Sequence, residues 1–317
     1  MAVQTRQVHL WQKSALCMGT LVRLQVVTSR PQADVQAAMD DAFDLMRQVE
    51  AACTRFDPDS ELMQLSRTVG RAVPVTQALF SALEFALEVA NYTDGRFDPT
   101  VGRAMEQSGF DRHYLTGETV QSTWSSEDGS WRDIELDAAA RTVLLKKPVV
   151  LDLGAVAKGL AVDLAAETLR AFDLQGFSIN AGGDVYVSGR DEFGEPWLVG
   201  VQHPTKKDEQ IACLRLTDCA VCTSGSYERR SPFRDDTFHI LRTDTLESPT
   251  GLTSLSAIGP YAMMCDAFST AAYLYGVQEG LELLQEVDLA GIAVTDTLRV
   301  EMTESAGRYL WDNRVGM

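Results

Sequence analysis

The feature that most constrains the fold is a succession of short apolar runs, separated by glycine-containing turns, between Phe177 and Leu216. Such runs are typical of β-strands, and short connections favour antiparallel pairing. The turns fall at Gly182-Gly183 and at Gly194. The expected strands are Phe177–Asn180, Asp184–Ser188, Trp197–His203 and Ile211–Leu216. The chain is therefore expected to build a sheet of several antiparallel strands.

Helical periodicity is present on both sides of this β-rich region. In residues 33–53 the apolar side chains recur at helical spacing, which indicates an amphipathic helix. Thr76 is expected to cap a second helix that stops near Asp94-Gly95. Further helices are expected at Ala155–Ala171, Asp266–Gly276 and Gln278–Val287, and further strands at Leu21–Val27, within 134–145, and at Val149–Leu153, Ile292–Val294 and Leu298–Met302. The pattern predicts a mixed α+β fold, with a mainly aperiodic loop over residues 98–133.

Composition and charge limit the classes of partner. The chain has 317 residues, 45% hydrophobic and 23% charged, as in ordinary globular proteins. No internal repeat or low-complexity linker divides it, so residues 1–317 are predicted to form a single domain with a sizeable core. The formal net charge of -17 would repel a nucleic-acid backbone, so no nucleic-acid partner is expected. A phosphorylated ligand would need local compensation by a metal ion, backbone N–H groups or a few cationic side chains.

The N-terminus and the cysteines favour a cytoplasmic protein with reduced thiols. The N-terminal residues lack the continuous apolar segment of a secretory signal, and the residues before Cys17 make a poor lipoprotein cleavage site. No apolar run reaches the length of about 18 residues that would span a bilayer. Cys219 and Cys222 form one lone C-x-x-C, for which buried packing is favoured over a metal or redox role.

Residues 151–163, LDLGAVAKGLAVD, join an expected strand through a glycine turn to a helix that begins beside Lys158. The free N–H groups of a helix N-terminus and a nearby lysine can together bind an anion. The spacing matches neither the Walker A pattern nor the dinucleotide-binding glycine pattern. On the residues alone, a tight strand-to-helix connection without a ligand is the favoured alternative.

Two other segments have both a functional and a structural interpretation. Gly182 and Gly183 would let the backbone approach a ligand closely, but a hairpin turn explains them equally well. Asp266 and Thr270 stand four residues apart and therefore on one helix face. Their hard oxygen atoms suit Mg²⁺, whereas the alternative makes Asp266 only the N-cap of its helix.

A polar glycine turn at residues 223–225 precedes an aromatic residue and two cations, and His239 follows after a further polar loop. The backbone N–H groups of Thr223, Ser224 and Gly225 could hold a phosphate. His239 is one of four histidines in the chain, and histidine is the side chain best suited to acid–base chemistry near neutral pH. A solvated loop with a surface histidine is the alternative interpretation.

Taken together and in order, these segments resemble the ApbE family of FAD:protein FMN transferases. The resemblance runs from about Met18 to the C-terminal hairpin, which is nearly the whole chain. The matching stretches are MGT at 18–20, TRFDPDSEL at 54–62, FDPTVG at 97–102, DLGAVAKG at 152–159 with Asp163, AGGD at 181–184, TSGSYER at 223–229 and DAFST at 266–270.

This resemblance implies an α+β fold of the ApbE type, T-fold-like, in which a mostly antiparallel sheet with flanking helices forms two lobes around a flavin nucleotide. It also implies transfer of FMN from FAD to a Ser or Thr hydroxyl of a target protein, with Mg²⁺ on the pyrophosphate and AMP leaving. The metal ligands that it implies are Asp266, Thr270 and the main-chain carbonyl of Ala157. The nucleotide-binding residues that it implies are Met18, Phe97, Asp98, Lys158, Asp163, Gly182, Gly183, Asp184, Thr223, Ser224 and Gly225.

The sequence departs from the family pattern after His239, which the resemblance implies is the general base. The family usually continues from its histidine through Asp-Pro to a Thr-Gly, whereas here Pro249-Thr250-Gly251 is displaced by several residues and Ser248 stands in place of the Asp. Two alternatives therefore stay open beside the transferase. One is a non-catalytic FAD-binding protein, and the other is a Mg²⁺-dependent FAD pyrophosphatase that yields FMN and AMP.

Overall fold

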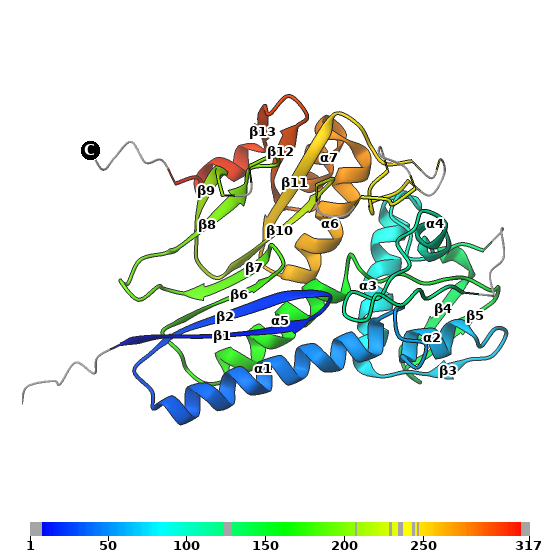
Figure 1. Ribbon diagram of the computed structural model, residues 1–317, viewed down its shortest axis with the longest axis horizontal. Helices are drawn as coiled ribbons and strands as arrows, with labels where there is room; N and C mark the ends of the chain where they lie inside the picture. The colour runs from blue at the N-terminus through cyan, green and yellow to red at the C-terminus, as the bar shows by residue number, and fades with distance from the viewer. Residues whose placement is uncertain are drawn as a thin grey trace, which may run out of the picture.

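The fold is built on an eight-stranded sheet whose neighbouring strands are all antiparallel, in the order β1-β2-β6-β7-β10-β11-β12-β13 (Figure 1). The computed structural model describes residues 8–122, 129–206, 208–227, 230–233, 237–242, 245 and 247–311. The strands are β1 (His9–Cys17), β2 (Thr20–Thr28), β6 (Gly176–Ala181), β7 (Asp184–Gly189), β10 (Cys219–Gly225), β11 (Leu252–Gly259), β12 (Ala290–Thr295) and β13 (Val300–Met302). This sheet confirms the predicted α+β class.

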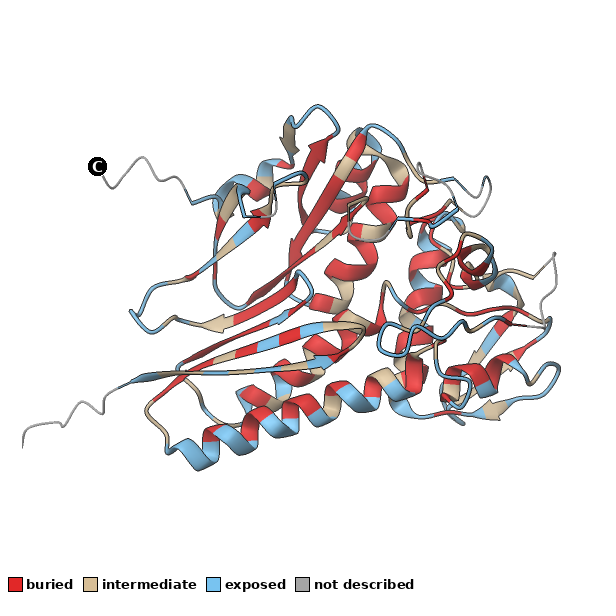
Figure 2. Cartoon of the chain, in the orientation of Figure 1, coloured by how far each residue is buried: buried red, intermediate tan, exposed pale blue. Residues whose placement is uncertain are grey.

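One face of the sheet is covered by helices that supply the larger hydrophobic core. These helices are α1 (Gln32–Cys53), α5 (Ala157–Arg170), α6 (Ala262–Tyr275) and α7 (Val277–Glu286), as Figure 1 shows. The apolar stripe of α1, from Val35 through Phe43 to Val49, is buried, whereas its outer face is exposed (Figure 2). Helix α6 is buried along almost its whole length, because it packs between the sheet and α5.

The opposite face of the sheet packs against a second, smaller core. Alternate strand residues such as Val185, Val221 and Ile258 belong to it, whereas their sequence neighbours Tyr186 and Ala257 belong to the helix-covered core. Successive side chains of a strand point to opposite faces, so the two clusters lie on the two sides of one sheet. The second core is closed by the β8 (Trp197–Gln202) and β9 (Gln210–Leu216) ribbon and by η2 (Glu304–Tyr309).

A second group of elements lies beyond the C-terminal end of α1, on the right in Figure 1. It consists of the three-stranded sheet β3-β5-β4 and short helices around α3. Its elements are α2 (Glu61–Ser66), β3 (Val73–Pro74), α3 (Gln77–Tyr92), α4 (Gly102–Gln107), η1 (Trp131–Asp133), β4 (Ile134–Asp137) and β5 (Thr142–Leu145). The hydroxyl of Thr76 accepts a hydrogen bond from the N–H of Leu79, which confirms the predicted cap of α3.

The predicted strand Val149–Leu153 is wrong. Only an isolated bridge between Val101 and Val150 forms there, and the N–H of Asp152 donates to the carbonyl of Pro99 at 2.8 Å. The segment is buried because loop 97–102 covers it, and its backbone groups bond to that loop instead of to a neighbouring strand. The apolar run therefore reflects the burial of this segment and not strand pairing.

Two central strands, β10 and β11, were not predicted. Residues 223–225, at the end of β10, were expected to form a polar turn. Instead these residues form the end of β10 and pair with β11. Cys219 and Cys222 both lie on β10, but they face the two different cores, so they pack separately as free thiols. Among the described residues, no helix is long and apolar enough to cross a membrane.

Candidate active site

The polar centre of the molecule is a lysine held between two buried carboxylates. The ammonium of Lys158, in the first turn of α5, lies 2.8 Å from Oδ2 of Asp184 and 3.1 Å from Oδ2 of Asp266. Asp184 is the first residue of β7, and Asp266 lies in the second turn of α6. Both carboxylates are about 5% exposed, whereas the lysine side chain is 28% exposed. We refer to these three residues as the Lys158 cluster.

Helices α5 and α6 cap each other, and this fixes the cluster in place. Oδ2 of Asp266 accepts the N–H of Gly159 at 3.1 Å, while the carboxylate of Asp163 accepts the N–H groups of Ala262 and Met263 at 2.7 and 2.9 Å. A Cβ atom on Gly159 would lie 2.4 Å from the Cα of Met263, so only glycine permits this approach. Because α6 already begins at Ala262, Asp266 is not its N-cap, and that alternative is wrong.

Burial and charge oppose each other within the Lys158 cluster. Burial alone would lower the pKa of Lys158, but the carboxylates of Asp184 and Asp266 outweigh it and raise that pKa, so the lysine stays cationic. Burial also raises the pKa of Asp266 above its ordinary value, and the neighbouring Asp184 carboxylate adds to the rise, against the effects of Lys158 and of the Gly159 N–H. The three groups therefore stabilise each other's charges only as a set.

A row of hydroxyl groups adjoins the cluster. The hydroxyl of Ser224 lies 2.9 Å from those of both Ser269 and Thr270, and the hydroxyl of Thr223 lies 2.7 Å from that of Ser256. The N–H of Thr223 donates to Oδ1 of Asp184 at 3.3 Å. Residues 223–225 pair with β11, and their predicted role in holding a phosphate stays a prediction. The segment therefore adds side-chain hydroxyls beside the Lys158 cluster.

The donor set at the cluster fits a hard divalent cation. Asp266 and Thr270 lie on one face of α6, and Ala157, whose carbonyl completes the expected ligand set, is the first residue of α5 beside Lys158. Within the described part of the chain no three His, Cys, Asp or Glu side chains gather to hold a metal ion. A cation here would therefore rely on one carboxylate with hydroxyl and carbonyl oxygens, ligands that Mg²⁺ accepts. The Lys158 ammonium already shows that this position favours positive charge.

The two glycine turns lie next to each other and next to Asp184. Met18, with φ of 55°, belongs to the β1–β2 turn, and Gly182, with φ of 67°, belongs to the β6–β7 turn. A Cβ atom on Gly182 would lie 2.5 Å from Oγ1 of Thr20, so the turns meet only because this residue is glycine. The side-chain oxygen of Asn180 accepts the N–H of Gly183 at 3.0 Å. The hairpin interpretation of the glycines is confirmed, and Asp184 follows directly.

Phe97 and Asp98 lie on the loop that covers the entry to α5. Phe97 is buried, and the carboxylate of Asp98 accepts the N–H and the hydroxyl of Thr100 at 2.8 and 2.7 Å. Burial raises the pKa of Asp98, against the effect of these hydrogen bonds. Because Pro99, the next residue, accepts the N–H of Asp152, this loop supports the turn that leads to Lys158.

The ion pair between Arg55 and Asp152 was not predicted from the sequence. Nε of Arg55 lies 2.5 Å from Oδ2 of Asp152, whose Oδ1 accepts the N–H of Gly154 at 2.8 Å. Arg55 also donates to the carbonyl of Phe110, and its side chain is only 3% exposed. Both residues stand inside matched motifs, but their pairing across 97 positions has no local signal in the sequence.

His239 lies on a separate loop. The neighbouring Phe238 forms an isolated antiparallel β-bridge with Arg230, and the hydroxyl of Ser248 accepts the N–H of Phe238 at 2.7 Å. Ser231, on the same loop, donates its hydroxyl to the carbonyl of Ser108 at 2.7 Å. Residues 228–229, the end of the TSGSYER stretch, and parts of the rewritten segment 241–248 lie outside the described residues. The assignment of His239 as general base stays a prediction.

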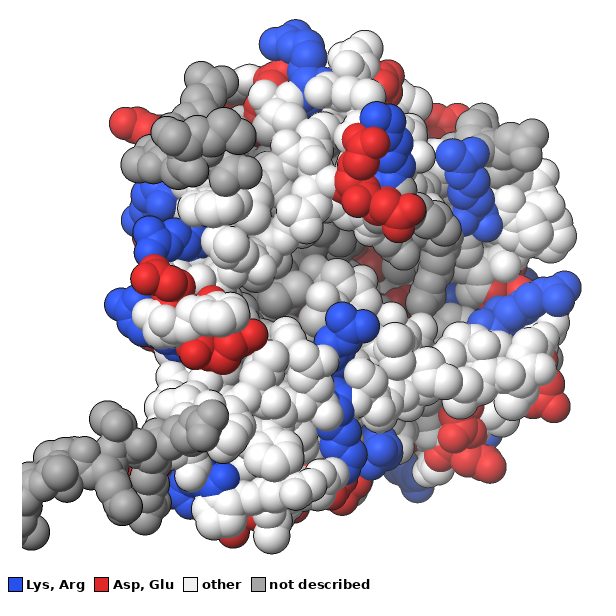
Figure 3. Space-filling view, turned by 60° about the vertical axis from the view of Figure 1, so that its left-hand side comes forward, with Lys and Arg blue, Asp and Glu red and all other residues white. Residues whose placement is uncertain are grey.

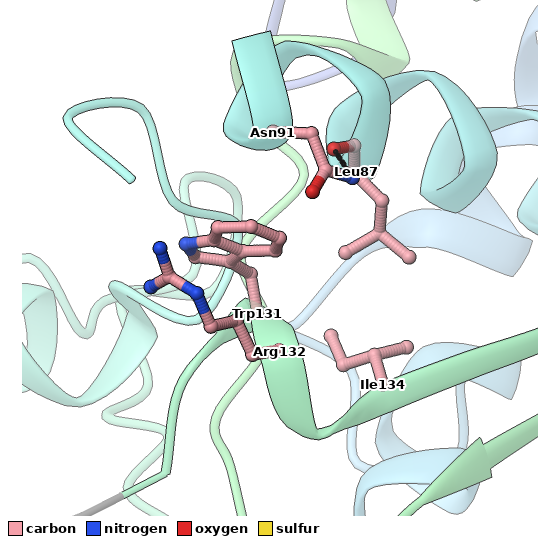
Figure 4. A pocket seen from close by; sticks show the side chains of 5 residues that line it. All are labelled: Leu87, Asn91, Trp131, Arg132 and Ile134. Atoms are coloured by element: carbon pink, nitrogen blue, oxygen red, sulfur yellow. Dashed lines mark hydrogen bonds between the residues drawn. The ribbon is translucent and has the colours of Figure 1, made fainter. Parts of the chain in front are cut away.

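Parts of the surface of the described chain are concave. Figure 3 shows one face hollowed near its centre, with acidic side chains visible inside the hollow. A cavity of about 390 Å³ lies between α3 and β4, and none of the cluster residues lines it. Figure 4 shows its lining of Leu87, Asn91, Trp131, Arg132 and Ile134. The candidate site is the Lys158 cluster, because buried carboxylates, an ammonium and hydroxyl groups gather there.

The class of protein is defined by an antiparallel sheet, two mutually capped helices on one face of it, and a buried lysine–carboxylate cluster between them. The profile of the ApbE family matches residues 18–294. The chain therefore belongs to the ApbE family, and the resemblance seen in its motifs is confirmed.

Relatives of known name agree with this membership. The FAD:protein FMN transferase of Treponema pallidum is 30% identical over 302 residues, covering 88% of this chain and 83% of the relative. The enzyme of the same name from Haemophilus influenzae is 25% identical, covering 84% of this chain and 80% of the relative. The crystal structure of the ApbE protein of Thermotoga maritima matches with a TM-score of 0.83 and 26% identity, covering 96% of this chain and all of that one.

Proposed function

We propose that this protein is a Mg²⁺-dependent FAD:protein FMN transferase that moves FMN from FAD to a Ser or Thr hydroxyl of a target protein and releases AMP. The observation that carries the proposal is the Lys158 cluster, the polar centre of a chain whose named relatives are FAD:protein FMN transferases. With a net charge of -17, the protein needs local positive charge to accept a pyrophosphate, which Lys158 and a metal ion at Asp266 would supply together.

In this proposal the FAD pyrophosphate lies against the N-terminal turn of α5. Asp266, Thr270 and the Ala157 carbonyl would hold the metal ion, which would neutralise negative charge on the phosphoryl oxygens. Lys158 would supply a second positive charge. The turns at Met18 and at Gly182-Gly183 would contact the nucleotide, as would Phe97 and Asp98 from the covering loop.

The proposed reaction exchanges a phosphoanhydride bond of FAD for a phosphoester bond to the acceptor. The acceptor hydroxyl oxygen forms a bond to the phosphorus of the FMN half, and the bond between that phosphorus and the bridging oxygen of AMP breaks. The proton of the hydroxyl passes to His239 as general base, and AMP leaves with the bridging oxygen. The products are AMP and a protein that carries FMN through a phosphoester.

The test is an assay with FAD, Mg²⁺ and candidate acceptor proteins that carry Ser or Thr sites. Mass spectrometry should show an acceptor heavier by one FMN less one water, and chromatography should show an equal amount of AMP. Removal of Mg²⁺ with a chelator should stop both. AMP and free FMN without a modified acceptor would instead indicate a pyrophosphatase, and bound FAD without AMP would indicate a binding protein.

Variants at the candidate residues separate binding from chemistry. Asp266→Ala should abolish metal-dependent turnover and weaken FAD binding, and Thr270→Val should act in the same direction but less. His239→Asn should keep FAD affinity within a few fold while transfer falls by about a hundredfold or more, the usual scale for loss of a general base. Unchanged transfer in His239→Asn would assign the base elsewhere.

A further inference from the structure

The ammonium of Lys158 contacts the Asp266 carboxylate, which the proposed metal ion would need as a ligand. Its ammonium lies 3.2 Å from Oδ1 and 3.1 Å from Oδ2 of Asp266, so one cation contacts both oxygens of that side chain. Oδ2 also accepts the N–H of Gly159. Because both oxygens of Asp266 are engaged in this way, a divalent cation has to compete with the lysine for them.

The same lysine can leave this position. Its side chain is the most exposed of the three, at 28%, and its Nζ also lies 3.4 Å from the carbonyl of Gly154, on the turn that leads into α5. Four flexible methylene groups allow the ammonium to move from a carboxylate to an anion bound at the N-terminus of α5. A nucleotide pyrophosphate at that terminus would therefore offer Lys158 a new partner.

We propose that Lys158 couples metal binding to nucleotide binding: its ammonium blocks Asp266 in the nucleotide-free protein, and a bound pyrophosphate draws it away and releases the carboxylate. This inference rests on the proposed function and adds an order of binding to it, in which the nucleotide precedes tight binding of the metal ion. Linkage is reciprocal, so FAD raises the affinity for Mg²⁺ by the same factor as Mg²⁺ raises the affinity for FAD. The protein would not hold a metal ion tightly before its substrate arrives.

A purely structural role for Lys158 makes a different prediction. If the lysine only neutralised two buried carboxylates, its removal would destabilise the fold, and the coupling between Mg²⁺ and FAD would persist. If the lysine competes with the metal ion, its removal raises the Mg²⁺ affinity of the nucleotide-free protein and weakens the coupling. Metal affinity without nucleotide therefore distinguishes the two roles.

The experiment is a calorimetric titration of Mg²⁺ into the full chain, without nucleotide and with saturating FAD that chromatography shows to be intact. In the wild type, FAD should tighten Mg²⁺ binding at least tenfold. In Lys158→Met, the nucleotide-free protein should bind Mg²⁺ at least tenfold more tightly than the wild type does, and FAD should tighten Mg²⁺ binding by a smaller factor than in the wild type. Lys206→Met, which removes an exposed lysine paired with Glu209 at 2.9 Å, is the matched control and should behave as wild type.

A double variant controls for folding and for net charge. Lys158→Met with Asp184→Asn removes one positive and one negative charge, so the cluster keeps the net charge of the wild type and buries only one carboxylate. Competition predicts that this variant also binds Mg²⁺ at least tenfold more tightly than wild type without nucleotide. Equal affinity of the double variant and the wild type would overturn the inference.

The outcomes also separate this inference from the function on which it rests. If the wild type binds Mg²⁺ only with FAD but neither variant gains affinity without FAD, the coupling through Lys158 is wrong and the proposed function stands. If wild-type protein binds no Mg²⁺ even with FAD, the metal assignment of the proposed function fails, and the inference fails with it.

Discussion

Lys158 and Arg132 are both cations next to carboxylates, but water reaches the two sites to very different degrees. Lys158 lies between Asp184 and Asp266, whose side chains are about 5% exposed. Arg132 lies 2.6 Å from Asp94 at the cavity between α3 and β4, and these side chains are 59% and 89% exposed. The shorter distance belongs to the exposed pair, so distance alone does not rank the two interactions.

The difference teaches that burial, together with the number of fixed partners, decides what a charge contributes. Asp266 also accepts the N–H of Gly159, and Asp184 accepts that of Thr223, so the Lys158 cluster is tied to the backbone of α5 and β10. Arg132 is held by Asp94 and by its stacking on the Trp131 ring, at 4.2 Å from the centroid. Changes at the cluster should spread through several elements, whereas changes at Arg132 should stay local.

The largest effect on stability is expected from Lys158→Met. This change leaves two buried carboxylates next to each other without a counter-charge, and breaking a buried ion pair in this way costs about 3–5 kcal/mol in the free energy of unfolding. Urea unfolding followed by circular dichroism measures it. Lys206→Met, at an exposed pair, is the control and should cost less than about 1 kcal/mol. Equal losses in the two variants would remove the distinction between the sites.

Arg55→Met should have the next largest effect, because Arg55 is 3% exposed and its partner Asp152 is 16% exposed. We expect a loss of about 3 kcal/mol, the lower end of the range for breaking a buried pair. The double variant Arg55→Met with Asp152→Asn leaves no unpaired carboxylate and should recover part of the loss. Without any recovery, packing of the arginine side chain, and not its charge, would explain the effect.

Asp163 allows a pH test of burial without breaking an ion pair. Burial raises the pKa of Asp163 to about 6, against two backbone N–H groups that lower it, from an ordinary value of 3.8. The folded protein therefore binds this proton more tightly than the unfolded chain, so its contribution to stability is full below pH 3.8 and is lost as the pH rises through about 6.

Asp163→Asn removes this titration. The stability of the wild type relative to the Asn variant should therefore fall by about 2 kcal/mol between pH 4 and pH 7, since one pKa unit corresponds to about 1.4 kcal/mol. Urea unfolding of both proteins at several pH values gives the difference, and effects of other titrating groups cancel. A constant difference across this range would mean that the helix N–H groups of α6 fully offset the burial.

Local patterns in the sequence predicted the elements with strong periodicity, but not those whose character depends on distant contacts. The helix predicted at 33–53 is Gln32–Cys53, and the two strands on either side of Gly182-Gly183 pair with each other as predicted. β10 was missed because its C-terminal residues Thr223 and Ser224 are polar, yet the hydroxyls are satisfied by Ser256, Ser269 and Thr270 from other elements. Nothing local to β10 reports those partners.

The candidate site shows the same difference between features that local patterns predict and features that depend on distant contacts. Asp266 and Thr270 could be grouped from their spacing on one helix, whereas the meeting of Lys158 with Asp184 and Asp266 needed the whole fold, because the lysine and Asp266 are separated by 108 positions. Only the resemblance to the ApbE family placed Lys158, Asp184 and Asp266 in one site before the fold was known. Neither the local patterns nor the family resemblance predicted that Asp163 caps α6, because the predicted start of this helix was four residues too late.

The smallest effect is expected at the exposed site of the comparison. Arg132→Ala removes a pair that water screens on both sides, so the free energy of unfolding should change by less than about 1 kcal/mol, which is the usual range for surface ion pairs. The change also removes the guanidinium that stacks on Trp131 and lines the cavity, so the fluorescence of that tryptophan should shift while FMN transfer stays the same. A loss of transfer in Arg132→Ala would mean that the cavity between α3 and β4 belongs to the reaction, for example as the place where the acceptor protein docks. The candidate site would then have to extend from the Lys158 cluster to α3, and the two regions compared above would no longer be independent.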